Sequence, residues 1–384
     1  MDPRQDLTSS VAFGTDRIAR LLGVVAERGL EALVVFSDGS CNILRASYLQ
    51  YVAGVRPMGP ACAVLLASGD VRLMVTPAWD AERIAARSWI DDVAGVASLA
   101  TALPSFLDQR GVRGAIGLAG DHAMTVEVYE ALAEQRAIVP ADAMVEAVAQ
   151  VMRPDDVALA HEVAGIADVG FAAFLEAARV GIREYELVAE IEHAMRLAGA
   201  DDNFILIGSG PHNEAMRAPV DRRLVPGDIV IVEITPERGG LFIQLCRTVV
   251  LGAAPRVLAD GYALLTRAFE AGAAELSAGV PVSRMAVTIN RMLAEAGYGE
   301  YCRPPFMRTR GHGFGVGSIG PGMVIDEHTD HVLTEDQVIV VHPNQYLPET
   351  GYLACGETLL VKRDGAERLA RTDTRLYVRG AQPC

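Results

Sequence analysis

Stretches rich in positive charge are missing from this 384-residue sequence, which carries 34 basic residues against 49 acidic ones and a formal net charge of −15. It has no run of lysine and arginine and no basic patch interleaved with aromatic residues. Binding to a nucleic acid backbone relies on such clusters of positive charge. The sequence therefore predicts no nucleic-acid partner.

Long uninterrupted apolar runs and paired cysteines are missing as well. No such run reaches the length of a bilayer-spanning helix, and the first residues lack the basic, apolar and small-residue order of a signal peptide. The six cysteines are scattered without CxxC pairs, which is typical of reduced, mostly buried side chains. We therefore expect a cytoplasmic protein without a membrane partner.

The composition that remains is that of a packed globular protein, with 51% hydrophobic and 22% charged residues. Residues 1–150 alternate helical and strand patterns and predict an α/β domain of ordinary size. Residues 151–384 begin with predicted helices at about 154–179 and 184–198, after which strand patterns return. The sequence predicts an α/β fold with two domains.

Several short motifs follow one another in the second domain. Segment 227–248 begins with Gly-Asp, continues as an apolar strand and ends in Arg-Thr, 311–315 reads Gly-His-Gly-Phe-Gly, and 341–343 reads Val-His-Pro. In this order and spacing they resemble the pita-bread superfamily, which contains methionine aminopeptidase, prolidase, creatinase and ectoine hydrolase. The resemblance implies a creatinase/prolidase-like N-terminal domain (1–150), a pita-bread catalytic domain (151–384) and a homodimer.

The resemblance also locates a metal site whose residues are largely replaced. In the metallopeptidases of the superfamily, two aspartates, a histidine and two glutamates hold two divalent ions. The corresponding residues here are Glu233, Gln244, His312, His342 and Gly356. Four carboxylates need two cations to neutralise them, whereas this set keeps one carboxylate and a formal charge of −1. We therefore do not expect a dinuclear metallopeptidase.

One interpretation is a metal-free site like that of creatinase, with no cofactor. His312 and His342 would be the catalytic proton-transfer pair, because an ordinary imidazole has a pKa of about 6.5. Glu233 would orient a histidine or bind a cationic group of the substrate. Gln244 and Glu357 would form hydrogen bonds to the substrate.

Two other interpretations stay open. Two histidines and a carboxylate form the facial triad of non-haem iron, so Glu233, His312 and His342 could hold one iron or zinc ion. The protein would then be a mononuclear metal-dependent lyase, hydrolase or oxidative enzyme. In the third interpretation the pita-bread domain is catalytically inactive and serves as a binding module.

The likeness to creatinase itself is incomplete. Its catalytic base corresponds to Met216, which cannot transfer a proton, and His212, four residues earlier, is either a substitute that contacts substrate or a solvent-facing loop residue. Cys246 stands where creatinase has a glutamate before Arg-Thr. It is either a small buried side chain or a nucleophile.

Arginines are candidates for binding a substrate carboxylate, because a guanidinium matches a carboxylate with paired hydrogen bonds. Arg310 directly precedes the Gly-His-Gly segment, and ion pairing within the protein is its alternative role. Arg56 corresponds to a segment that reaches the neighbouring subunit's site in creatinase-like dimers.

Taken together, these observations predict a metal-independent, creatinase-like enzyme. Its expected reaction is hydrolysis of a C–N bond in a small, polar, nitrogen-containing metabolite that bears a carboxylate. The expected partners are this small-molecule substrate and a second copy of the chain.

Overall fold

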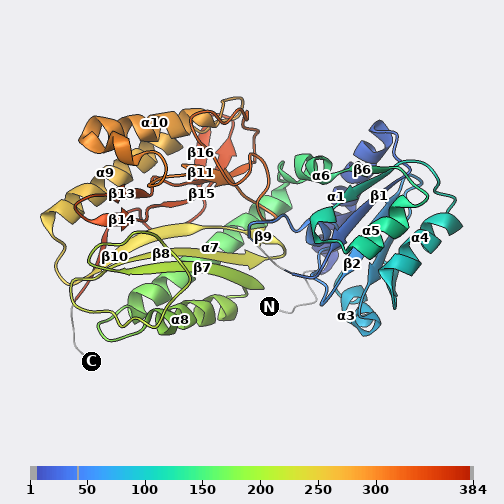
Figure 1. Ribbon diagram of the computed structural model, residues 1–384, viewed down its shortest axis with the longest axis horizontal. Coiled ribbons are helices and arrows are strands. Elements are labelled where there is room, and N and C mark those ends of the chain that lie inside the picture. Colours follow the sequence, from blue (N-terminus) through green and yellow to red (C-terminus); the bar gives the residue numbers. More distant parts are fainter. Residues whose placement is uncertain (1–6, 41–42, 381–384) are drawn as a thin grey trace. The chain divides into compact units, whose positions relative to one another are not determined.

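The computed structural model describes residues 7–40 and 43–380. The chain divides into two compact units, Met1–Gln150 and Val151–Cys384, called here the N-terminal and C-terminal units. Each unit has its own large sheet with helices packed on it, which confirms the predicted α/β class (Figure 1).

The N-terminal unit is built on a six-stranded sheet in the order β4-β3-β2-β1-β5-β6. Strand β1 pairs antiparallel with β2 and parallel with β5. Apolar side chains of β1, β2 and β5 share a core with α4 and α5. The strands are β1 (Ala32–Ser37), β2 (Ala61–Leu66), β3 (Val71–Val75), β4 (Val93–Gly95), β5 (Ile116–Ala119) and β6 (Ile138–Pro140). The helices are α1 (Leu7–Glu27), α2 (Tyr48–Ala53), α3 (Ala81–Ala85), α4 (Leu99–Gln109), α5 (Val126–Ala133) and α6 (Asp142–Ala149).

The C-terminal unit contains a nine-stranded sheet whose main path is β11-β12-β15-β10-β8-β7. Short strands β9, β16 and β17 pair with β8, β15 and β10, and β13 and β14 form a separate hairpin. The strands are β7 (Asp202–Gly210), β8 (Ile229–Arg238), β9 (Leu241–Phe242), β10 (Leu245–Leu251), β11 (Gly311–Gly313), β12 (Val338–Val341), β13 (Gln345–Leu347), β14 (Gly351–Leu353), β15 (Gly356–Lys362), β16 (Gly365–Arg368) and β17 (Tyr377–Arg379).

Four helices cover the two faces of this sheet (Figure 1). They are α7 (Pro154–Ala177), α8 (Glu184–Leu197), α9 (Arg256–Ala273) and α10 (Ser283–Leu293). On one face of the sheet, α7 and α8 form a core with alternate residues of β8 and β10. On the other face, α9 and α10 form a second core with residues of β8 and β10 whose side chains point the opposite way. Because both faces are covered, β8 and β10 are buried along almost their whole length. This explains why they read as continuous apolar runs.

The predicted start of α7 is confirmed. Pro154 is the first helical residue, where its missing N–H costs no hydrogen bond, and the Asp156 carboxylate accepts a hydrogen bond of 2.8 Å from the Arg153 N–H. By length and composition alone this helix could cross a bilayer, which was not predicted from the sequence. In the fold its apolar side, including Phe171 and Phe174, packs in the core with α8 and β8.

Candidate functional site

The strand register brings Glu233 and Cys246 together at the centre of the C-terminal sheet. Glu233 lies in β8 directly opposite Cys246 in β10, and Cys246 lies opposite Gly356 of β15 on its other side. Gln244 precedes β10 by one residue, two positions from Cys246, and successive side chains of a strand alternate between faces. Gln244, Cys246 and Glu233 therefore share a cluster on one face.

Two histidines complete this cluster from the neighbouring strands. His312 is the middle residue of β11, and His342 directly follows β12. The His342 N–H donates a hydrogen bond of 2.8 Å to the Arg310 carbonyl, which fixes the backbone beside β11. The two imidazole rings are perpendicular, with centroids 5.1 Å apart. The predicted convergence of Glu233 with both histidines is thus present in the structure.

Gln244 connects Glu233 to His312. Its Oε1 lies 2.8 Å from His312 Nε2, and its side chain also forms a hydrogen bond with Glu233. The other ring nitrogen, Nδ1, lies 3.2 Å from the Gly313 carbonyl oxygen, so hydrogen-bonding groups at both nitrogens hold the His312 ring in place. The backbone of Gln244 is itself held by Thr358, whose hydroxyl accepts its N–H at 2.8 Å. Gln244 is a rigid bridge inside the protein.

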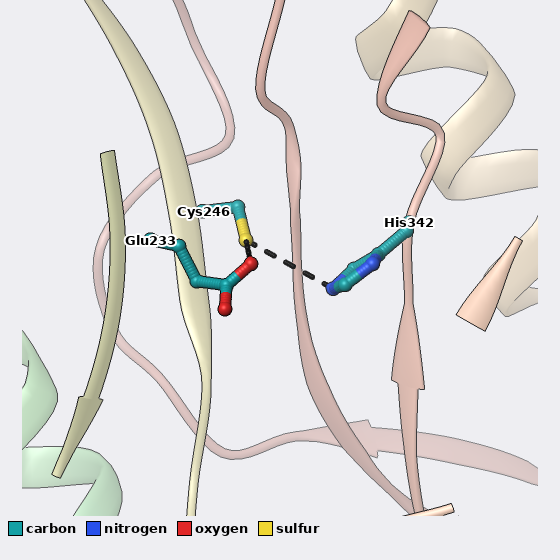
Figure 2. Close-up of side chains that lie close together, drawn as sticks. All are labelled: Glu233, Cys246 and His342. Atoms are coloured by element: carbon teal, nitrogen blue, oxygen red, sulfur yellow. Dashed lines mark hydrogen bonds between the residues drawn. The ribbon is translucent and has the colours of Figure 1, made fainter. Parts of the chain in front are cut away.

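Cys246 forms the second centre of the cluster (Figure 2). Its Sγ lies 3.7 Å from Glu233 Oε2 and 3.9 Å from His342 Nε2. Its side chain is fully buried, and Glu233 and His342 are also buried, with 7% and 6% of their surface exposed. All three donor groups of this centre therefore lie inside the protein.

Burial displaces the pKa of every titratable group in the cluster. Burial raises the pKa of Glu233 to about 7, against smaller lowering by its hydrogen bonds with Gln244 and Cys246. Burial lowers the pKa of His312 to about 4 and that of His342 well below its ordinary value. Burial, together with the Glu233 charge, raises the pKa of the Cys246 thiol. The two imidazoles therefore do not keep the ordinary pKa expected from the sequence, because burial disfavours the charged form of each ring.

Two of the predicted substrate contacts belong to the scaffold instead. Glu357 is fully buried and accepts hydrogen bonds from Arg247 and Arg368, the latter at 2.6 and 3.0 Å. Arg310 is also buried and donates to the Asn290 side chain, the Asn344 carbonyl and the Gln345 side chain at 2.6, 3.0 and 2.9 Å. Because these partners occupy both groups, we assign neither of them a substrate contact.

The remaining predicted contacts lie outside the cluster. His212 is exposed, with Nε2 3.0 Å from the Pro348 carbonyl and its ring beside Tyr346. Met216 packs against the core under α9 and α10. Arg56 belongs to the N-terminal unit, where its carbonyl accepts a hydrogen bond of 3.0 Å from Arg83. The structure gives His212 no place in the cluster, and the role of Arg56 in a dimer stays a prediction.

Two features were missed or undervalued in the sequence. Cys246 was weighed as a nucleophile or a small core residue, yet its two-residue spacing from Gln244 already indicated a shared strand face. Tyr352, in β14, was not considered. Burial and the nearby Cys246 and Glu233 raise the pKa of its phenol. A neutral phenol beside the cluster is a hydrogen-bond donor for a polar ligand.

The cluster does not fit two metal ions. Gly356 offers no side chain, and the Gln244 Oε1 already faces His312 at 2.8 Å. Glu233 is the only carboxylate among the five corresponding positions, so it has no partner with which to bridge two cations. The paired divalent ions of the superfamily therefore lack their donors here.

Known protein families match both units. Residues 158–363 match metallopeptidase family M24, and residues 17–153 match the creatinase/prolidase N-terminal domain. The first match covers more than half of the sequence, and the two follow each other in the order that the resemblance implies. The chain belongs to metallopeptidase family M24.

Curated relatives and solved structures agree with this assignment. The Xaa-Pro dipeptidases of Pyrococcus furiosus and Pyrococcus horikoshii are each 27% identical, over 58% and 55% of this chain and 63% and 60% of their own lengths. The prolidase structure from Pyrococcus horikoshii has a TM-score of 0.79 at 20% identity, covering 93% of this chain and 99% of its own. The X-Pro aminopeptidase from Thermotoga maritima gives 0.81 at 20% identity, with 94% and 99% covered. The match to the curated relatives spans less than two thirds of their length, and the structures establish the fold.

These comparisons correct two predictions. The sequence predicted a metal-independent, creatinase-like enzyme without a cofactor. Both predictions are contradicted, because the chain belongs to a family of metallopeptidases and its relatives are named Xaa-Pro dipeptidase. The comparisons also give no support to the expectation that the chain is not a dinuclear metallopeptidase, because its relatives are named as dipeptidases, which are hydrolases of C–N bonds. The broader prediction of a hydrolase agrees with the relatives.

Proposed function

We propose that this protein is a metal-dependent hydrolase of a peptide-type C–N bond in a small substrate. The observation that carries the proposal is the buried cluster of Glu233, Gln244, His312 and His342 at the positions where the superfamily holds its metal ligands. Keeping a carboxylate and two neutral imidazoles buried costs folding free energy. Such a cost supports a retained function for the site.

The residues of the cluster divide into two roles. His312 and Gln244 hold each other and Glu233 in place, which fixes the carboxylate without using a cation. Glu233, Cys246 and His342 present their donor atoms to one another. A bound divalent ion would supply Lewis-acid polarisation of a carbonyl oxygen or of water.

Metal dependence and substrate class can be tested together. The purified protein should be stripped with a chelator, reloaded with zinc, manganese, cobalt or iron(II) in turn, and assayed for amine release from Xaa-Pro dipeptides, other dipeptides and simple amides. We expect turnover that the chelator abolishes and one of the metals restores. His342→Ala should lower kcat/KM by at least about 10-fold, whereas His193→Ala, on an exposed position of α8, should not.

The outcomes separate clearly. Turnover that survives complete removal of metal would contradict the dependence on metal, and no release from any amide by the reloaded protein would contradict the hydrolase. We also propose that the chain forms a homodimer and acts in the cytoplasm. Light scattering on the purified protein tests the dimer, and a mass equal to one chain would exclude it.

A further inference from the structure

Three side chains of the cluster form a site of their own. Glu233, Cys246 and His342 each contribute one ligand atom, and these atoms all lie within 4.8 Å of one another. The superfamily's ligand positions include Glu233 and His342, whereas Cys246 lies two residues beyond the position of the second aspartate. We propose that Glu233, Cys246 and His342 bind one divalent metal ion of the zinc type, in place of the two ions of the superfamily. This inference specifies the metal site on which the proposed function depends.

The distances suit tetrahedral zinc. Zinc binds thiolate sulfur at about 2.3 Å and histidine nitrogen or carboxylate oxygen at about 2.1 Å, so a sulfur and an oxygen or nitrogen on one ion are about 3.6 Å apart. The corresponding separations here are 3.7 Å from Cys246 Sγ to Glu233 Oε2 and 3.9 Å from Sγ to His342 Nε2. The three donors come from β8, from β10 and from the residue after β12, and their side chains lie close together (Figure 2). Little movement is needed to seat an ion.

The charge of the set matches one ion and not two. A thiolate, a carboxylate and a neutral imidazole carry −2 in total, which a single divalent cation balances. A second cation would leave +2 in a buried place, with Gln244 occupied by His312 and no side chain at Gly356. Thiolate and imidazole also favour zinc over the harder ions that all-carboxylate sites accept.

Gly356 is part of the same rearrangement. A Cβ at this position would lie 3.1 Å from His342 Cδ2 and 2.3 Å from the Val341 carbonyl. The His342 ring thus occupies space that a side chain at 356 would need. Both departures from the two-ion ligand set, the missing side chain at 356 and the imidazole at 342, therefore lie at the same place in the cluster.

Three protein donors fill three of the four positions of a tetrahedral ion. Catalytic zinc sites have three protein ligands and one open position for water or substrate. Glu233 and His342 are the members of the set with exposed surface, while Cys246 has none. The open position would therefore face the side from which solvent reaches the cluster.

Spectroscopy of the cobalt-substituted protein tests this site without reference to turnover. The metal-stripped full-length protein is titrated with Co²⁺ and Zn²⁺, and bound metal is counted by elemental analysis. We expect one equivalent per chain and the near-ultraviolet charge-transfer band of a thiolate–cobalt bond. Cys246→Ser should remove the band and weaken zinc binding by at least about 10-fold. Cys355→Ser alters another fully buried cysteine of the same core and should keep both properties.

X-ray absorption of the zinc-loaded wild-type protein makes the test independent of whether a variant folds. One sulfur neighbour together with nitrogen and oxygen neighbours supports the site. Two equivalents of metal, a first shell without sulfur, or no metal bound would each overturn it. If one thiolate-bound ion is found but no amide is cleaved, the proposed function fails while the site stands. If the protein binds two ions and cleaves amides, the proposed site fails while the proposed function stands.

Discussion

At the scale of single residues, two buried glutamates of the C-terminal unit meet opposite surroundings. Glu357 is matched by the guanidinium groups of Arg247 and Arg368, so its charge is balanced within the protein. Glu233 has an amide and a thiol as its hydrogen-bonding neighbours. The first carboxylate is part of the scaffold, and the second has charge available for a ligand.

This difference predicts that Glu357→Gln destabilises the fold strongly. Removing the carboxylate charge leaves Arg247 buried without its balancing anion, which typically costs about 3–5 kcal/mol. Urea unfolding of both proteins, followed by far-ultraviolet circular dichroism, measures the loss. Glu335→Gln is the matched control, since Glu335 pairs with Arg363 at 3.4 Å on the exposed surface and should change stability little. Equal effects of the two substitutions would contradict the structural role of Glu357.

The sequence could predict which residues meet in the cluster but not what each of them contacts. Glu233, His312 and His342 follow from the spacing of the motifs, because the superfamily fold brings those positions together. The scaffold roles of Glu357 and Arg310 depend on partners 11 to 110 residues away in the chain, such as Arg368 and Arg247. No local pattern records such pairs.

At the scale of elements, helix α7 contains one glycine position with space for a larger side chain and one without. Gly165 is exposed, and a Cβ there meets no atom within 4 Å. Gly170 faces the core, where a Cβ would lie 2.8 Å from Met195 Cγ and 3.2 Å from Ile234 Cγ2. The helix approaches α8 and β8 closely because this position lacks a side chain.

We therefore expect opposite effects from the same substitution in α7. Gly165→Ala should stabilise the protein by about 0.5–1 kcal/mol, because alanine loses less backbone entropy in a helix. Gly170→Ala should destabilise it by about 1–3 kcal/mol through overpacking. The denaturant midpoints of unfolding of the two variants, compared with that of the wild type, measure both effects. A gain in stability from Gly170→Ala would show that α7 can move away from the sheet.

Element types were predictable where local chemistry decides them. Pro154 and Asp156 mark the start of α7, and the helix predicted at 184–198 corresponds to α8, Glu184–Leu197. Helix α10 ends at Leu293 and is followed by a π turn in which Gly297 has φ 96°. Helix ends of this kind depend on packing as well as on sequence.

At the scale of the whole molecule, a bound ion should add to the stability of the folded chain. A ligand that binds the folded state alone stabilises it by about 2.7 kcal/mol when its concentration is 100 times Kd. We expect Zn²⁺ to raise the unfolding temperature of the metal-stripped protein, as measured by calorimetry. Cys246→Ser should show a smaller rise at the same zinc concentration, and Cys355→Ser the full rise. An equal rise in all three proteins would place the stabilising ion elsewhere.

The architecture of the molecule was the most predictable level. The α/β class and the pairing of a creatinase/prolidase-like domain with a pita-bread domain both follow from ordered motifs and are confirmed. The chemistry was less predictable, because the pKa of a histidine depends on how deeply the finished fold buries it. His312 illustrates this, since burial takes its pKa to about 4.

The burial of Cys246 also governs how readily its thiol would be oxidised. The sulfur has no exposed surface, and Glu233 and His342 lie beside it at 3.7 and 3.9 Å. Peroxide or an alkylating reagent must reach a buried thiol whose pKa is raised, and a thiol reacts far more slowly than a thiolate. An ion bound to all three side chains would in addition occupy the sulfur. Irreversible oxidation would then begin with the loss of the metal, which ties the working lifetime of each molecule to its supply of zinc.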